Sequence, residues 1–143
     1  MSTSDSIPSH LQALLQDTPV THLLGQQIQS LDLQAGTITV QYHASEQFLN
    51  PARQVQGGMV SAMLDDVTAV LVTATLEPGA FCATLSLNTS FLAAAKAGEI
   101  TGKSWFESRG KNICNVRGEL WQNGQRVATA TAVCMLRRPT NPA

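Results

Sequence analysis

The stretch NPARQVQGGMVSAMLDDVTAVLVTATL, residues 50–76, decides the fold of this chain. It begins as a polar loop, passes through the Gly57-Gly58 pair and continues as an apolar run that only two neighbouring aspartates interrupt. A Pro-Gly pair shortly after the run is a strong stop signal, so a helix over about residues 58–76 is predicted. Its low polarity predicts that the helix lies in the centre of the domain.

The two aspartates within this apolar helix need an explanation, because burying an unpaired carboxylate costs on the order of several kcal/mol. Helical spacing puts Asp66 on the most apolar face. Asp65 instead shares a stripe of small and polar residues with Ser61, Thr68 and Val72. Such a stripe can line a cleft, where a partly desolvated Asp65 can act as general base or nucleophile. The alternative for either acid is an ordinary helix carboxylate paired to an arginine or a backbone donor.

Composition limits the possible functions. The chain has 143 residues, of which 43% are hydrophobic and 13% charged, with a formal net charge of −1. This length fits one domain over residues 1–143, with 1–19 as an N-terminal extension and 138–143 as a flexible tail. The charge balance argues against a nucleic-acid surface. Because the charged fraction is low, we expect other copies of the chain to cover part of the surface.

Other classes of site and location are also disfavoured. Three widely spaced cysteines without a histidine cluster argue against a disulfide framework and against a metal site. The first ten residues lack the basic and then apolar pattern of a signal peptide. No 18-residue segment is as free of polar residues as a membrane span requires. We therefore expect a cytoplasmic protein without a membrane partner.

The rest of the chain is predicted to form mostly strands. A short amphipathic helix is predicted around residues 7–16, ended by Pro19, and a hairpin follows from Thr21. Its second strand, TITVQYHA, alternates apolar and polar residues. Four more strands are predicted after the central helix, over residues 81–92, 98–108, 113–122 and 126–137.

Short connections, including the Asn123-Gly124 turn, predict mostly antiparallel pairing of these strands. The last strand has small or apolar residues on both faces, which predicts that both faces are covered. The fold class is therefore α+β, a long central helix wrapped by a curved sheet of about six strands.

The start of the central helix is a candidate for polarising a carbonyl. Gly57 and Gly58 offer backbone N–H groups at the positive end of the helix dipole, although the pair can equally be a tight entry turn. Gly57 and Asp65 are eight residues apart, about 12 Å along the axis. They cannot act on one carbonyl carbon within a single chain. Two helices packed antiparallel across a two-fold axis would bring them together.

These motifs resemble a known family. The order Asn50, Gln56-Gly57-Gly58 and Asp65-Asp66, followed by ATLSLNTSFLAAAKAGE at 83–99, resembles the hotdog-fold acyl-CoA thioesterases of the phenylacetate-degradation (PaaI-like) type. The resemblance covers about residues 20–137. It implies a hotdog fold, hydrolysis of an acyl- or aryl-CoA thioester, and active sites at the interface of a homodimer that often assembles into a tetramer. It implies no cofactor, because coenzyme A is part of the substrate.

The resemblance also implies roles for single residues. The family's asparagine falls on Asn50, its glycine amide donor on Gly57 and its catalytic acid on Asp65. A serine or threonine that orients water in some members falls on Thr84. The usual histidine is Gln56 here, which can donate and accept hydrogen bonds but cannot titrate. Asp65 is therefore expected to carry the acid–base or nucleophilic role alone.

Further residues are expected to bind substrate. Arg53 stands where many members have a small residue, so it can narrow the pocket or bind a carboxylate or phosphate. Cations in the turn near residue 110 can bind the phosphates of coenzyme A, although ordinary solvated charges are an equal alternative. The complete expected binding set is Gly58, Arg53, Ser61, Arg109 and Lys111.

Two other functions stay open. A hotdog hydratase or dehydratase would usually need a histidine paired with an acid, and the central helix and its loop contain none. A non-catalytic acyl-CoA-binding or regulatory protein would explain Gln56 as a trace of lost catalysis. Retention of both Asn50 and Asp65 argues for the enzyme.

Overall fold

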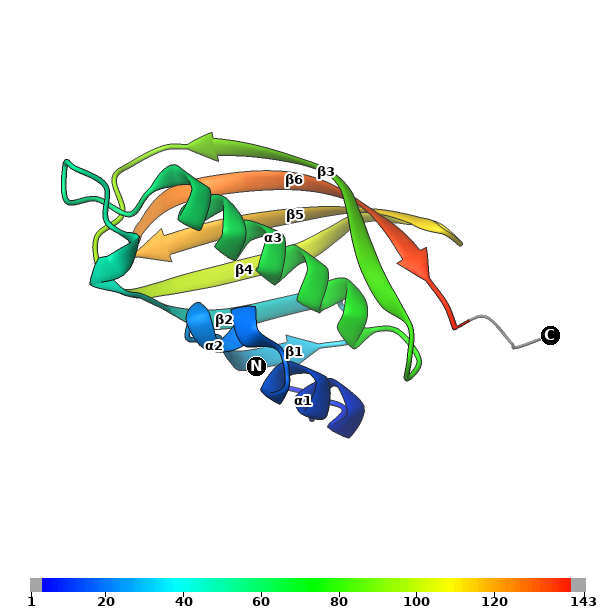
Figure 1. Ribbon diagram of the computed structural model, residues 1–143. Helices are drawn as coiled ribbons and strands as arrows, with labels where there is room; N and C mark the ends of the chain where they lie inside the picture. The colour runs from blue at the N-terminus through cyan, green and yellow to red at the C-terminus, as the bar shows by residue number, and fades with distance from the viewer. Residues whose placement is uncertain (1–3, 140–143) are drawn as a thin grey trace.

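The computed structural model describes residues 4–139, which form a long helix, α3 (Gly57–Ala74), wrapped by a six-stranded sheet (Figure 1). Each pair of neighbouring strands is antiparallel, in the order β1-β2-β4-β5-β6-β3. The predicted α+β architecture is therefore confirmed. The strands are β1 (Gln27–Asp32), β2 (Thr37–Ala44), β3 (Phe81–Phe91), β4 (Gly98–Arg109), β5 (Ile113–Gln122) and β6 (Gln125–Arg137).

The core lies between α3 and the inner face of the sheet. The alternation predicted for β2 is confirmed, since Ile38, Val40 and Tyr42 are buried. Two glycines bring the sheet unusually close to the helix. A Cβ on Gly102 would lie 3.3 Å from a methyl group of Val67 and 2.9 Å from the Tyr42 ring, and one on Gly118 would lie 3.1 Å from the Thr68 methyl group. Neither position has room for a larger side chain, so these glycines set the height of α3 above β4 and β5.

The N-terminal region differs from the prediction. The predicted first helix is present as α1 (Ser9–Gln16). Pro19 does not simply end it but begins a second short helix, α2 (Pro19–Leu23), because proline fits the first turn of a helix. The first strand consequently starts at Gln27 rather than near Thr21. Both helices pack along the β1 side of the sheet (Figure 1).

The chain ends are described only in part. The expected flexible tail covers 138–143, of which 140–143 lie outside the described residues, as do residues 1–3 of the expected extension. Arg138 is held by two contacts. Its guanidinium lies 3.3 Å from a carboxylate oxygen of Glu77 and donates a hydrogen bond to the carbonyl of Lys111. A short 3-10 helix, η1 (Glu46–Phe48), leads into the loop before α3.

The two faces of β6 are unequal. Ala128, Ala130, Ala132 and Cys134 point inward and are buried. On the outer face Thr131 is exposed and Thr129, Val133 and Met135 are partly exposed, so within the described chain this face is covered only in part. The expectation of a cover on both faces therefore stays a prediction about other copies of the chain.

By length and composition alone, α3 is apolar enough to cross a membrane. Half of that window is buried inside the domain, and a buried core helix passes the same test.

Candidate functional site

Asp65 and Thr84 are brought together by the packing of α3 against β3. The Thr84 hydroxyl donates a 2.8 Å hydrogen bond to Oδ1 of Asp65. One turn earlier on the helix, the Ser61 hydroxyl lies 3.5 Å from Oγ1 of Thr89. Asp65 is partly buried, and no donor among the described residues reaches its second oxygen, Oδ2. One carboxylate oxygen is thus fixed, while the other is available to a ligand.

A β-bulge in β3 allows Thr84 and Thr89 to face the helix together. Five residues apart, they would point to opposite faces of a regular strand. The pairing of β3 with β6 shifts between Thr84 and Ser86, and Leu85 is the extra residue. Sequence analysis therefore predicted Thr84 but missed Thr89, because alternation alone assigns it to the outer face.

The predicted cleft along the Asp65 stripe is only half present. Thr68 and Val72, the C-terminal members of the stripe, are fully buried. The Thr68 hydroxyl donates to backbone carbonyls of its own helix, including that of Asp65. The reason is Gly118, which lets β5 pack directly onto Thr68. Only Ser61 and Asp65 remain partly accessible.

Asp66 lies in a different environment, about 100° around the axis of α3 from Asp65. Its Oδ2 accepts hydrogen bonds from the Tyr42 hydroxyl at 2.6 Å and from the Gln26 side-chain amide at 2.5 Å. Burial raises the pKa of Asp66, and these two hydrogen bonds oppose the rise. Burial, followed by the neighbouring Asp66 charge, also raises the pKa of Tyr42. Asp66 is a paired interior carboxylate, although its partners are neutral side chains rather than an arginine or the backbone.

The N-terminus of α3 is open. Gln56 precedes the helix as its N-cap, but its side chain is exposed and makes no capping hydrogen bond. Among the described residues, no acceptor contacts the amides of Gly57 and Gly58. A Cβ on Gly58 would meet nothing within 4 Å, and one on Gly57 only the Phe91 ring at 3.4 Å. Unpaired N–H groups at the positive end of an 18-residue helix can bind a developing negative charge.

The loop before the helix is organised by Asn50. Its side-chain oxygen accepts hydrogen bonds from the amides of Ala52 at 2.9 Å and Gln54 at 3.1 Å. The oxygen of Asn50 is therefore committed to the loop, while its amide nitrogen has no partner among the described residues. Arg53 is exposed at the tip of this loop with φ of 62°, a conformation uncommon outside glycine. None of the described carboxylates forms an ion pair with it.

The predicted phosphate-binding cations lie elsewhere. Arg109 ends β4 and Lys111 follows in the turn to β5, both exposed. The Arg109 guanidinium stacks 4.2 Å from the centre of the Phe106 ring. Arg138 reaches the same turn, so three cations gather at this end of the sheet. No described contact joins them to Asp65 or to Gly57.

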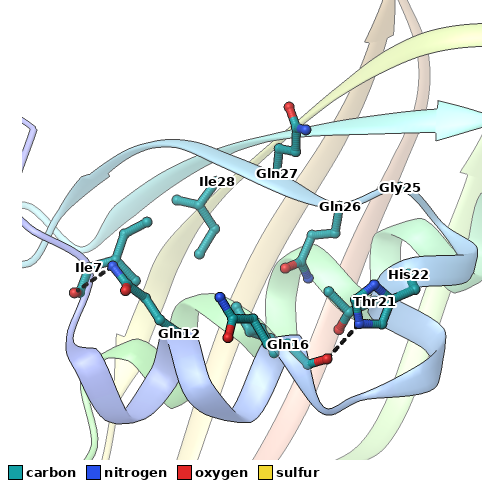
Figure 2. Close-up of a pocket in the computed structure, with 10 residues that line it drawn as sticks. Ile7, Gln12, Gln16, Thr21, His22, Gly25, Gln26, Gln27 and Ile28 are labelled. Atoms are coloured by element: carbon teal, nitrogen blue, oxygen red, sulfur yellow. Dashed lines mark hydrogen bonds between the residues drawn. The ribbon is translucent and has the colours of Figure 1, made fainter.

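Figure 2 shows a cavity of about 450 Å³ between α1, α2 and β1 that contains none of the predicted site residues. Glutamines and a few apolar side chains line it, and Gln26 connects its wall to Asp66. A second cavity, of about 300 Å³, adjoins Gly57. Within residues 4–139 there is no cluster of three or more His, Cys, Asp or Glu side chains suited to a metal ion.

The comparisons with known proteins agree with this fold. The family described as the thioesterase superfamily matches residues 55–129. A phenylacetic acid degradation-related protein of Ralstonia eutropha JMP134 is 54% identical, with a TM-score of 0.84 over 89% of this chain and 99% of that chain. The PaaI protein of E. coli, from the phenylacetic acid degradation operon, is 20% identical, with a TM-score of 0.79 over 91% and 95% of the two chains.

A thioesterase from Haemophilus influenzae is 17% identical, with a TM-score of 0.79 over 95% of this chain and 93% of that chain. At such low identity this likeness, like that to the E. coli protein, concerns the fold alone. No curated protein sequence matches the chain.

Proposed function

The chain belongs to the thioesterase superfamily and has the hotdog fold, and we propose that it hydrolyses an acyl- or aryl-CoA thioester to the free acid and coenzyme A. The observation that carries the proposal is the hydrogen bond from Thr84 to Asp65, which holds a half-accessible carboxylate on the central helix. Hydrolysis needs a group that delivers a water or attacks the carbonyl, and Asp65 has one oxygen free for either task.

The proposed reaction begins at the N-terminus of α3. The amide of Gly57 donates to the acyl carbonyl oxygen, assisted by Gln56 or by the amide nitrogen of Asn50, and stabilises the oxyanion. Asp65 takes a proton from a water as the water oxygen adds to the carbonyl carbon. The C–S bond then breaks, and the thiolate of coenzyme A leaves and is protonated. In the alternative route Asp65 attacks directly, and water hydrolyses the resulting anhydride.

The amide donor and the acid are proposed to come from different subunits of a homodimer. The support is β3, an edge strand of 11 residues with exposed Phe81, Leu85 and Phe91. A long apolar edge invites pairing with another strand. Asp65 lies beside Thr84 and Gly57 beside Phe91, and Thr84 and Phe91 are six ladder steps, about 20 Å, apart along the strand.

Antiparallel pairing of β3 with its own copy resolves this separation. Because Leu85 is an extra residue, a two-fold axis through the pair formed by Asn88 and its own copy would put Thr84 opposite the partner subunit's Phe91. Asp65 of one copy would then approach the partner subunit's Gly57. Tetramer formation from two such dimers is a further proposal, since the outer face of the sheet stays uncovered in a single chain.

Complementation between two inactive variants tests this arrangement. Gly57→Pro replaces the N–H by a ring carbon without breaking the helix, because proline fits the first position of a helix and Gln56 already has the extended φ of −56° and ψ of 136° that proline requires before it. Gly57→Ala keeps the N–H and is the matched control. Asp65→Asn removes the acid. Each variant is assayed alone and after refolding as a mixture, with release of coenzyme A measured by thiol titration.

Mixed dimers would recover one intact site of two, so an equal mixture is expected to reach about a quarter of wild-type activity. Mixtures without recovery, although native mass spectrometry finds mixed dimers, would contradict the shared site. Wild-type protein that binds acyl-CoA esters but hydrolyses none across a broad panel would contradict the thioesterase itself.

The substrate's phosphates are proposed to lie near Arg109 and Lys111, with Arg53 at the loop as the other candidate. Arg137 pairs with Phe81 at the start of β3, so the basic end of the sheet lies on the Asp65 side of the edge strand. Replacing Arg109 and Lys111 together by alanine should raise KM for acyl-CoA and leave KM for the matching acyl-pantetheine unchanged. Equal effects on both substrates would contradict phosphate binding.

A further inference from the structure

The cavity beside Gly57 has a buried floor and exposed walls. Its volume is about 300 Å³, and it lies between the N-terminus of α3 and the segment that follows β3. The side chains of Phe91 and Leu92 belong to its lining and are exposed. The floor consists of buried apolar residues, Val55, Val60, Ala95 and Val127.

The side chains that line the cavity are almost all apolar. No ionisable side chain lines the cavity, and Gln54 is its single polar side chain, exposed at the loop. The amides of Leu92 and Ala93 both donate to the carbonyl of Val127, and the amide of Val55 donates to the carbonyl of Ala95. A ligand with amide or charged groups would lose its water there without gaining partners. A hydrocarbon group gains by leaving water.

The cavity is continuous with the proposed oxyanion site. The ring of Phe91 lies 3.4 Å from the position of a Cβ on Gly57, and Gly57 itself belongs to the lining. A thioester whose carbonyl oxygen is held by the Gly57 amide has two substituents on its carbonyl carbon. One is the acyl group and the other is the sulfur of the pantetheine arm, which carries two amides. The apolar cavity fits the first and not the second.

We propose that this cavity holds the acyl group of the substrate, that the group is an uncharged hydrocarbon, and that Phe91 limits its length. This proposal rests on the thioesterase function. A volume of about 300 Å³ is at the small end of ligand pockets, so the acyl group is of modest size. Because each buried methylene is worth about 4-fold in binding, the limit should appear as a sharp optimum in a homologous series.

The experiment measures kcat/KM of the full-length protein for straight-chain acyl-CoA esters from acetyl to palmitoyl. Phe91→Ala opens the cavity and is expected to move the optimum to longer chains, while Phe91→Trp closes it and moves the optimum to shorter ones. Leu23→Ala is the control, because Leu23 is 55% exposed, close to the 58% of Phe91, and lines no described cavity. Its profile should match the wild type.

A charged acyl group provides a second comparison. Adipyl-CoA has the same chain length as hexanoyl-CoA but ends in a carboxylate. The uncharged ester is expected to be hydrolysed at least 10-fold faster in kcat/KM, because no described cation faces the cavity. Equal rates would overturn the assignment of the cavity.

The outcomes separate this inference from the proposed function. Absence of hydrolysis of every thioester by the wild type overturns the thioesterase itself. Hydrolysis with an unchanged chain-length profile in both Phe91 variants overturns only the acyl pocket. A uniform rise in KM for all chain lengths in the Phe91 variants would assign the cavity to the pantetheine arm, and it would also overturn the proposed acyl pocket. If the alanine variant loses its oligomeric state, Phe91→Leu replaces it in the same assay.

Discussion

Asp65 and Asp66 are neighbours on α3, yet the two sides of the helix that they occupy differ in the elements they face and in their hydrogen bonds. The Asp65 side faces the edge strand β3, whose threonine hydroxyls approach it, and it keeps one carboxylate oxygen free. The Asp66 side faces the interior, where Tyr42 and Gln26 share one carboxylate oxygen. A rotation of about 100° about the helix axis therefore separates a carboxylate that can take part in a reaction from one that stabilises the fold.

The largest expected effect is a loss of turnover in the variant of Asp65 but not in the variant of Asp66. Asp65→Asn is expected to lower kcat by about 100-fold or more, because a positioned acid or base contributes roughly that much. Asp66→Asn should keep kcat close to the wild type, since its oxygen can still accept from Tyr42. Steady-state hydrolysis of one acyl-CoA ester measures both. Equal losses in the two variants would remove the distinction between the two sides.

The second effect is on stability and should have the opposite pattern. Asp66→Ala leaves the buried Tyr42 hydroxyl and the Gln26 amide without an acceptor, so the free energy of unfolding should fall by about 2 kcal/mol. Asp65→Ala should cost less, because Asp65 accepts one hydrogen bond, from the partly buried Thr84, whereas Asp66 accepts two, one of them from the fully buried Tyr42. Urea denaturation followed by fluorescence measures the two values. A larger loss at Asp65 would contradict the interior role of Asp66.

A smaller effect on turnover is expected at the strand. Thr84→Ala removes the hydrogen bond that fixes Oδ1 of Asp65, and kcat should fall about 10-fold, the equivalent of about 1.4 kcal/mol. Thr84→Ser retains the hydroxyl and should recover most of the activity. Unchanged kcat in the alanine variant would mean that Asp65 is held by the helix alone.

The smallest effect is the pH dependence of stability. Burial raises the pKa of Asp66 above its ordinary 3.8, so the folded protein binds this proton more tightly than the unfolded chain does. The corresponding stability is present below pH 3.8 and is lost as pH rises through the raised pKa. The unfolding free energy of the wild type minus that of Asp66→Asn should therefore decrease as pH rises through that window. A difference that increases would mean that the hydrogen bonds from Tyr42 and Gln26 outweigh burial.

Local patterns were enough to predict most of the fold. The central helix, its approximate ends and the hairpin at Asn123-Gly124 follow from periodicity and turn chemistry, which act over a few residues. Periodicity also separated Asp65 from Asp66. The short helix from Pro19 was missed, because the first position of a helix and the residue after one accept proline equally well.

Local sequence patterns could not predict the environment of each acid. Tyr42 and Gln26 lie 24 and 40 residues from Asp66 in the chain, and no local signal links them to it. The supposed cleft along the Asp65 stripe failed for a similar reason, since Gly118 on a distant strand decides how deeply Thr68 is buried. Distances between elements, rather than the elements themselves, were the missing information.

The bulge at Leu85 also governs which changes β3 can tolerate. Deletion of Leu85 would make the pairing of β3 with β6 regular and would leave Thr84 and Thr89 four residues apart. Both hydroxyls would then still face the helix, because residues four apart lie on the same face of a strand. If the bulge were removed while every residue of β3 was kept, one of the two threonines would turn to the outer face. The proposed site therefore depends on the number of paired residues between the two threonines, and Leu85 is the residue that the pairing leaves out.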